Sequence, residues 1–209
     1  MNRFGVDNKE QLQNICQNSQ NINYLGAYTH LFSNDKQTSD QQIDKFLSIS
    51  PFNFNHITFK EGVNYKKLQK ISSVRSGINV LGAISNSLGL KQALEIYGKV
   101  IKIRALSKGQ NAGYDYGFVA DCDCLVAIVN FGYSDMAIKR AVGWKVLIKD
   151  RLYEVKFVAM DVLFVVVDKE VNIGDKVIIS GDFAPISINR LANYLGTIPY
   201  EMTCSYKDK

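Results

Sequence analysis

The chain has 209 residues, 46% of them hydrophobic and 11% aromatic, with a formal net charge of +5. This length and composition allow a hydrophobic core in one or two domains, exclude a disordered protein, and provide neither a run of about 18 apolar residues that could span a membrane nor a secretory signal. The positive charge suits phosphate or carboxylate ligands as well as it suits nucleic acid.

Residues 1–92 alternate predicted helices and strands with short connections, which is typical of parallel βα units. Two capping-box patterns, at residues 7–10 and 39–42, predict where the first two helices begin. In chain order, the pattern predicts a helix after 7–10, a strand at 23–29, a helix after 39–42, a strand at 54–59, a helix at 63–71 and a strand at 73–81.

Residues 93–209 read as a mostly β region, because apolar residues alternate with polar ones and only one helix interrupts. That helix covers 187–195, with Ser187 as its N-cap and Gly196 directly after its end. The predicted strands cover 94–106, 114–120, 125–130, 143–149, 153–167 and 176–180. The sequence therefore predicts two regions, 1–92 and 93–209.

The strand at 125–130 ends in Phe131, Gly132 and Tyr133. A glycine at a strand end tolerates a bend and lets another backbone or a ligand come close. Tyr133 would then be held outward, where its phenol can meet a substrate. From these residues alone, a core tyrosine that hydrogen-bonds a loop is the favoured interpretation.

The four cysteines have neither the spacing of a disulfide framework nor that of a zinc site. They are Cys16, Cys122, Cys124 and Cys204. We expect reduced thiols in a cytoplasmic protein, and no metal.

A set of ordered motifs resembles the alanine racemase family along all 209 residues. The motifs are MNRFG at 1–5, AYTHLFSND at 27–35, VRSGI at 74–78, GYSDM at 132–136, VAMD at 158–161, NIGDKVIISG at 172–181 and LGTIPYE at 195–201. The resemblance implies the end of a PLP-binding (β/α)₈ barrel over 1–92, as an incomplete TIM-barrel portion, followed by the family's C-terminal β domain over 93–209.

The activity that this resemblance implies is the interconversion of L- and D-alanine with pyridoxal 5'-phosphate (PLP), which supplies D-alanine for cell-wall synthesis. It also implies a small amino-acid substrate and either a homodimer or a partner that supplies the rest of the barrel. No nucleic acid and no membrane are expected as partners.

Site residues follow from the resemblance one position at a time. Tyr133 matches the tyrosine that acts as the base on one face of the substrate Cα, and Arg3 and the Met160 backbone amide match groups that bind the substrate carboxylate. His30 and Arg75 match a pair near that tyrosine and the cofactor ring, with Arg75 facing the pyridine nitrogen. The remaining matches are Gly77, Ile78 and Tyr200 around the cofactor phosphate, and Asp35 at the access channel.

Some positions depart from the family pattern. Phe59 and Lys60 stand where the family has Asn-Ser, Met136 replaces a glycine after the tyrosine, and Phe157 replaces a basic residue of the access channel. We expect Met136 to disturb its turn.

A complete (β/α)₈ barrel needs about 250 residues, and no lysine here matches the family's Schiff-base lysine. We therefore expect an N-terminally truncated racemase polypeptide that is inactive alone. Half of a split enzyme and a non-catalytic dimerisation or binding module are the alternatives. A nucleic-acid-binding β domain rests only on charge and tyrosines.

Overall fold

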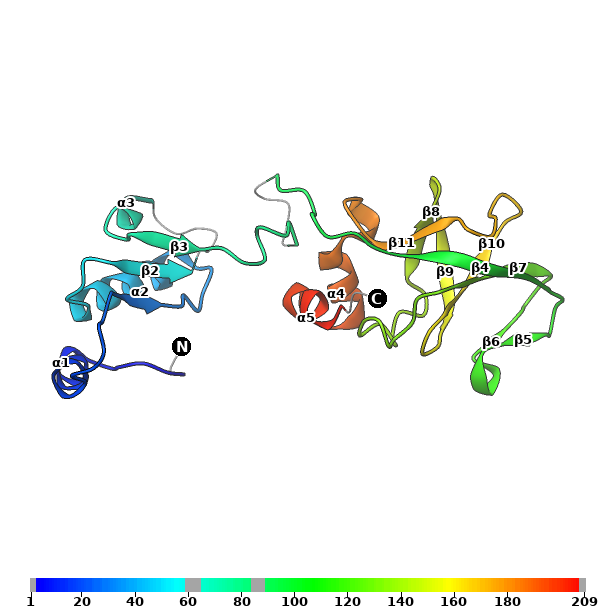
Figure 1. The fold of residues 1–209 in the computed structure, drawn as a ribbon. Helices are drawn as coiled ribbons and strands as arrows, with labels where there is room; N and C mark the ends of the chain where they lie inside the picture. Colours follow the sequence, from blue (N-terminus) through cyan, green and yellow to red (C-terminus); the bar gives the residue numbers. More distant parts are fainter. Residues whose placement is uncertain (1–2, 59–64, 84–88, 207–209) are drawn as a thin grey trace. The chain divides into compact units, whose positions relative to one another are not determined.

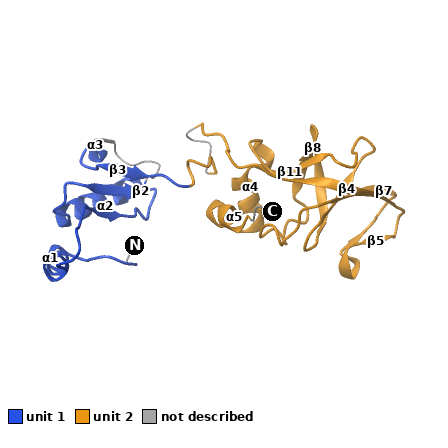
Figure 2. Cartoon of the chain, in the orientation of Figure 1, with its two compact units in different colours: residues 1–77 blue, residues 78–209 orange. Residues whose placement is uncertain are grey.

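The computed structural model describes residues 3–58, 65–83 and 89–206, which form helices, strands and one closed β-barrel. The chain divides into two compact units, residues 1–77 and residues 78–209 (Figure 2). Each unit is described by itself. Within the described ranges, no helix is long and apolar enough to cross a membrane.

Unit 1 contains a three-stranded parallel sheet in the order β1–β2–β3 (Figure 1). The register places Tyr28 beside His56, and Thr58 beside Arg75. The elements of this unit are α1 (Lys9–Asn18), β1 (Ala27–Thr29), α2 (Lys36–Ile49), β2 (Asn55–Thr58), α3 (Tyr65–Leu68) and β3 (Ser73–Arg75).

One face of this sheet is packed by helices. Leu31, Ile43 and Ile57 are fully buried there, and side chains of α2 and α3 pack against them. Because successive residues of a strand point to opposite faces, His56 lies on the other face from Ile57. The sheet therefore has one apolar face that is covered by helices and a second face that carries His56.

The predicted capping boxes place the N-caps of the first two helices at Asp7 and Ser39, and both positions are wrong. Asn8 caps α1 by accepting from the Gln11 amide at 2.9 Å. Asp35 caps α2 by accepting from the Thr38 amide at 2.8 Å, so the carboxylate assigned to the access channel is a helix cap. Ser39, predicted as a cap, lies inside α2, is buried and donates to the Ser33 carbonyl.

The predicted strands of unit 1 are longer than the observed ones. The strand predicted at 23–29 begins only at Ala27. The strand predicted at 73–81 ends at Arg75, and the backbone amides of Leu81 and Gly82 close turns by donating to carbonyls three residues earlier. Residues 59–64, which include Phe59 and Lys60, lie outside the described residues.

Unit 2 is built on a closed antiparallel barrel in the order β10–β7–β4–β11–β8–β9, which β9 closes onto β10 (Figure 1). The barrel forms because its strands alternate buried and outward-facing residues. In β10, Leu163, Val165 and Val167 are buried inside, while Phe164 and Val166 face outward. The barrel strands are β4 (Ile96–Leu106), β7 (Cys124–Val129), β8 (Lys145–Ile148), β9 (Arg151–Val158), β10 (Leu163–Val167) and β11 (Lys176–Ser180).

Two helices pack beside the barrel. In α4 (Ile188–Leu195), Ser187 accepts from the Arg190 amide and Gly196 takes the left-handed conformation at φ +75°, which confirms both predicted caps. Helix α5 (Pro199–Ser205) was not predicted, because seven residues give too short a periodic pattern.

Two strand predictions in unit 2 are wrong. Residues 114–120 contain a 3₁₀ turn, η2 (Tyr114–Tyr116), and only a short strand, β6 (Phe118–Val119), which pairs with β5 (Asn111–Ala112). The cause is the backbone, since Asp115 and Tyr116 have φ of 49° and 56° and cannot continue a strand. The stretch predicted at 153–167 is two strands, β9 and β10, joined by a turn.

Candidate active-site residues

Tyr133 follows β7 and is joined to the turn between β9 and β10 by backbone hydrogen bonds. Its amide donates to the Ala159 carbonyl at 3.1 Å, and the Ser134 amide donates to the Met160 carbonyl at 2.9 Å. A Cβ on Gly132 would lie 2.1 Å from the Met160 carbonyl oxygen, so only glycine permits this approach. The structure thus brings Tyr133 and Met160 together.

The turn that carries Tyr133 is closed from inside. Asp135 is buried and accepts from the Gly132 amide at 2.8 Å, while its own amide donates to the Gly132 carbonyl at 3.1 Å. Met136 is 1% exposed and packs in the barrel core. The expected disturbance by Met136 is therefore wrong, because its side chain fills core space instead of crowding the turn.

The Tyr133 side chain is 37% exposed, which excludes the core-tyrosine interpretation. The Lys139 ammonium lies over its ring, 5.8 Å from the centroid. Among the described residues, the Met160 amide N–H has no hydrogen-bond acceptor, and the Met160 side chain is exposed. A phenol and a free amide donor therefore stand on two segments that are fixed to each other.

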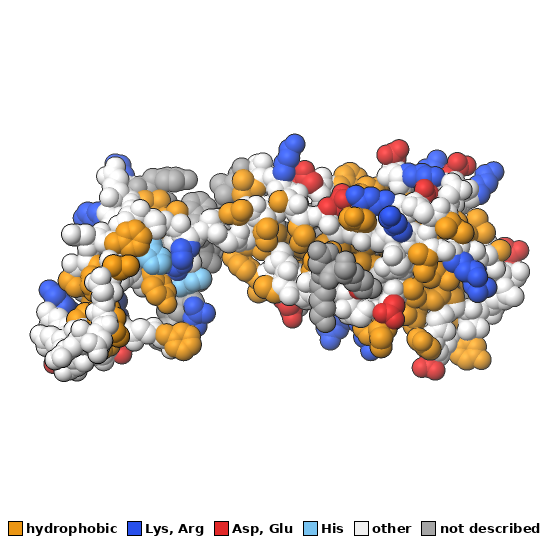
Figure 3. All heavy atoms as spheres, in the orientation of Figure 1, with side chains coloured by type: hydrophobic (Ala, Val, Ile, Leu, Met, Phe, Trp, Pro, Cys, Tyr) orange, Lys and Arg blue, Asp and Glu red, His pale blue; other side chains and the backbone are white. Residues whose placement is uncertain are grey.

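Unit 1 holds a second cluster, centred on Arg75. Its Nη1 donates to His56 Nδ1 at 2.6 Å, and its Nη2 donates to the Thr29 carbonyl at 3.3 Å. The guanidinium also lies over the Tyr28 ring at 5.0 Å, and Tyr28 stacks on His56 with centroids 5.2 Å apart. Figure 3 shows histidine side chains on this unit next to Lys or Arg and exposed hydrophobic side chains.

His56 is held neutral in this cluster. Partial burial and then the positive charge of Arg75 lower the pKa of His56 below its ordinary value. Because a guanidinium can only donate, His56 Nδ1 must accept and the ring proton sits on Nε2. The Arg75–His56 pair was not predicted from the sequence. In the parallel register, Ser73 lies beside His56, and Arg75, two residues further on, points to the same face of the sheet.

His30, predicted as the histidine near Arg75, is exposed, and its carbonyl accepts from Gln42 Nε2 at 2.9 Å. Arg75 itself donates hydrogen bonds to His56 and Thr29. Arg3 lies exposed in the segment before α1.

The three residues expected around a phosphate differ in their surroundings. Gly77 is exposed, and a Cβ there would meet nothing within 4 Å. The Ile78 side chain is buried in the core of unit 2, and its carbonyl accepts from the Leu81 and Ala83 amides. Tyr200 lies in the first turn of α5 with its side chain 51% exposed.

The predicted residues are therefore divided between the two units. Unit 1 carries Arg3, His30, Arg75 and Gly77, and unit 2 carries Ile78, Tyr133, Met160 and Tyr200.

The profile of the family described as "Alanine racemase, C-terminal domain" matches residues 93–209, more than half of the chain. The chain belongs to the alanine racemase family. The alanine racemase of Listeria innocua is 31% identical over 226 residues, which cover 98% of this chain and 61% of that protein. The alanine racemase of Lactobacillus acidophilus is 26% identical over 234 residues, which cover all of this chain and 62% of that protein.

Solved alanine racemases have the same fold. The enzyme of Clostridium difficile 630 superposes with a TM-score of 0.86 at 24% identity, over 99% of this chain and 60% of that chain. The biosynthetic alanine racemase of Pseudomonas aeruginosa gives 0.80 at 24% identity, over 99% of this chain and 62% of that one. The chain thus spans about three fifths of the length of the racemases it matches.

Proposed function

We propose that this chain supplies the tyrosine-bearing β domain and part of the PLP-binding barrel of an alanine racemase, which interconverts L- and D-alanine. In this proposal residues 1–92 are the end of a (β/α)₈ barrel and residues 93–209 the C-terminal β domain. The rest of the barrel, with the lysine that holds the cofactor, comes from residues outside this sequence, on the same or another polypeptide.

The sheet of unit 1 supports the barrel assignment. In the described part of unit 1, helices α2 and α3 pack on the face of Ile57, while the other face carries Tyr28, His56 and Arg75. In a (β/α)₈ barrel, helices cover the outside of a parallel sheet, side chains of the inner face fill the interior, and the active site lies at the carboxyl ends of the strands. Arg75 lies at the carboxyl end of β3, where barrel enzymes place their functional residues.

The donor set of this cluster fits PLP. His56 and Thr29 fix the guanidinium of Arg75, which remains charged and can only donate hydrogen bonds. Opposite the pyridine nitrogen, Arg75 would offer a donor and give up no proton. When bound, PLP supplies an electron sink for the charge that develops when Cα loses its proton.

The single observation that carries the catalytic proposal is the backbone join between Tyr133 and Met160. It fixes a phenol relative to a free amide N–H, so a substrate whose carboxylate binds the Met160 amide has a defined position relative to Tyr133. Arg3 would pair with the same carboxylate. Tyr133 would then remove a proton from one face of Cα, or return it, as a positioned general base or acid.

A rescue experiment tests this proposal. The chain is mixed with a full-length alanine racemase whose matching tyrosine has been changed to alanine, and racemisation is measured with purified heterodimer. Loss of a positioned base costs about 10² to 10⁴ in rate, so returned activity should stand well above background. Tyr133→Phe in this chain should abolish the gain, and Tyr114→Phe, at an exposed tyrosine of unit 2, should leave it unchanged.

Rescue that survives Tyr133→Phe would refute the role of Tyr133. The second candidate function is a non-catalytic binding or dimerisation module, which the closed barrel with its own buried core favours. A demonstrated heterodimer without any returned activity would support that module instead.

A further inference from the structure

Residues 107–120, here called the flap, form a hairpin, and part of it lines a groove of about 620 Å³ together with the outer face of the barrel. The flap contains β5, η2 and β6, which extend from the barrel in Figure 1. The floor of the groove is apolar and consists of Val126, Ile128 and Phe164 from two neighbouring strands. This volume lies within the range of about 300–1,000 Å³ for small-molecule sites.

Phe157 holds the flap at a fixed distance from the barrel. Its ring fills the space beside two flap glycines, so that a Cβ would lie 2.6 Å from the ring at Gly113 and 2.1 Å at Gly117. The same ring packs edge-on against Phe164, with centroids 5.6 Å apart and planes at 73°. The aromatic residue at this position therefore supports the flap and fixes the width of the groove.

The base of the flap is tied by backbone hydrogen bonds. Gly109 donates to the Ala120 carbonyl at 2.8 Å, and Ala120 donates to the Gln110 carbonyl at 2.9 Å. The Lys108 amide donates to Asp123 Oδ1 at 2.9 Å. With both ends fixed, the groove is formed before any ligand binds, which lowers the entropic cost of binding.

The rim of the groove supplies hydrogen-bond donors and one positive charge. Arg104, Gln110 and Asn111 line it, and none of the lining residues is acidic. Among the described residues, Arg104 has no ion-pair partner, and the side-chain N–H groups of Gln110 and Asn111 have no acceptor. Arg104 is paired in register with Val126, so its charge lies beside the apolar floor.

We propose that this groove binds a small monocarboxylate with an aromatic or branched apolar body. The body would lie on Val126, Ile128 and Phe164, and the carboxylate would accept from Arg104 and the rim amides. An arginine next to an apolar wall binds a carboxylate more strongly than one in open water, since the effective dielectric constant is lower. The groove lies under the flap and is lined by residues other than Tyr133 and Met160, while Phe157, which supports the flap, stands at the position that the family resemblance assigns to the access channel. Binding in the groove can be measured whether or not the chain contributes to a racemase.

The test uses the whole ¹⁵N-labelled chain and two probes of matched shape, 3-phenylpropionate and 3-phenylpropan-1-ol, followed by two-dimensional amide NMR. We expect saturable shifts at Gly113, Gly117 and Ile128 with the acid, and an apparent affinity at least tenfold lower for the alcohol. Arg104→Gln should reduce the affinity for the acid to that for the alcohol. Lys99→Gln, at an exposed lysine of the same strand outside the groove, should change neither.

Unperturbed amide signals from β10 show that a variant is folded. If Arg104→Gln disturbs them, the comparison of acid and alcohol on the unaltered chain decides. The proposal is overturned if the acid gives no saturable shifts, if acid and alcohol bind equally well, or if a folded Arg104→Gln variant binds the acid unchanged.

Discussion

Gln92 and Ile188 are 96 positions apart in the chain, and the Gln92 side-chain oxygen accepts a hydrogen bond from the Ile188 amide at 2.7 Å. Ile188 is the first residue of α4, whose opening amides lack partners within the helix. The Gln92 amide group also donates to the Leu94 carbonyl at 2.5 Å and to Ser180 Oγ, which is buried, at 3.2 Å. One side chain thus fastens the segment before β4 to the start of α4.

Gln92→Ala should therefore destabilise unit 2 by about 1–3 kcal/mol, the usual cost of leaving buried polar groups without partners. Gln92→Glu separates the two roles of the side chain, because a carboxylate still accepts from the Ile188 amide but places a negatively charged oxygen against the Leu94 carbonyl in place of the donor, so this variant should also be less stable than the unaltered chain. Urea denaturation followed by the fluorescence of Trp144, which is buried in this unit, measures both variants. Equal stability of the alanine variant and the unaltered chain would contradict this role.

Gly132→Ala should disrupt the join between Tyr133 and Met160. The added methyl would lie 2.1 Å from the Met160 carbonyl oxygen, which is backbone and cannot move aside freely. Overpacking of this kind costs about 1–3 kcal/mol. Gly77→Ala is the control, since nothing lies within 4 Å of its Cβ position.

Thermal unfolding of the two alanine variants provides the comparison. We expect Gly132→Ala to unfold at a clearly lower temperature and Gly77→Ala to unfold near the unaltered chain. A Gly132→Ala protein as stable as the Gly77→Ala protein would show that the two segments are not in close contact.

The stability of unit 1 should fall as the pH drops below about 6.5. The pKa of His56 in the folded protein is lower than its ordinary value of 6.5, because of partial burial and the Arg75 charge. The unfolded chain therefore binds more protons in this window, and acid favours unfolding. The contribution is complete above 6.5 and is lost as the pH falls through the folded-state pKa.

NMR titration of the His56 ring measures this directly. Arg75→Gln should raise the pKa of His56 by removing the charge, although part of the shift remains because burial is its larger cause. His56→Gln should remove the dependence of stability on pH in this window. An unchanged pKa in Arg75→Gln would contradict the contribution of the Arg75 charge to the lowered pKa of His56.

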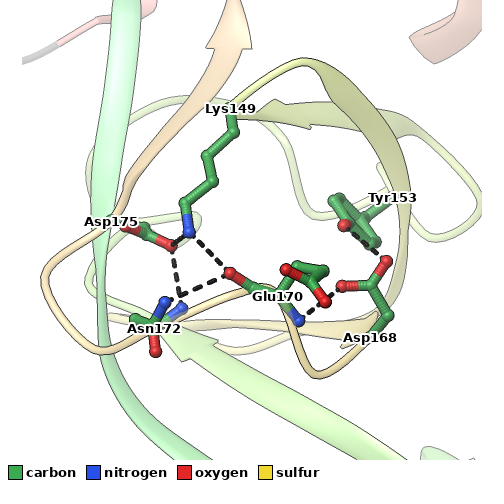
Figure 4. A network of polar contacts seen from close by, with 6 residues as sticks. All are labelled: Lys149, Tyr153, Asp168, Glu170, Asn172 and Asp175. Atoms are coloured by element: carbon green, nitrogen blue, oxygen red, sulfur yellow. Dashed lines mark hydrogen bonds and ion pairs between the residues drawn. The ribbon is translucent and has the colours of Figure 1, made fainter.

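The loops at one end of the barrel should weaken in stronger acid. Figure 4 shows Asp168 accepting from the Glu170 amide and the Tyr153 hydroxyl, and Asp175 accepting from the Asn172 amide and pairing with Lys149. The backbone amides come first among the causes that hold the pKa of both carboxylates below the ordinary 3.8.

Because these folded-state pKa values are lowered, the stabilisation is present above pH 3.8 and is lost as the pH falls further. Asp175→Asn should flatten the fall in stability between about pH 4 and 2. Asp150→Asn is the control, at an exposed carboxylate for which the described part of the chain offers no hydrogen bond. A steep fall that Asp175→Asn leaves intact would place the acid sensitivity elsewhere.

The sequence alone determined the family, the β-rich character of the second region and those elements whose signals are local. Strand β11 and helix α4, with Ser187 and Gly196 at its ends, were predicted because a strand's alternation and a helix's caps depend on neighbouring residues. The same local reasoning placed the start of α2 four residues too late. The Ser39 hydroxyl donates to the Ser33 carbonyl, and the carboxylate that accepts from an amide of the first turn belongs to Asp35.

Only the tertiary structure decided which distant residues meet. The pairing of Arg75 with His56 depends on the register of two parallel strands, and the join of Tyr133 to Met160 depends on the contact of Gly132 with a turn 28 positions later. The support of the flap by Phe157 likewise became visible only once two glycines were seen against its ring. Such contacts have no local signature, because they result from strand pairing and packing across the whole barrel, which are not encoded in any single stretch of the chain.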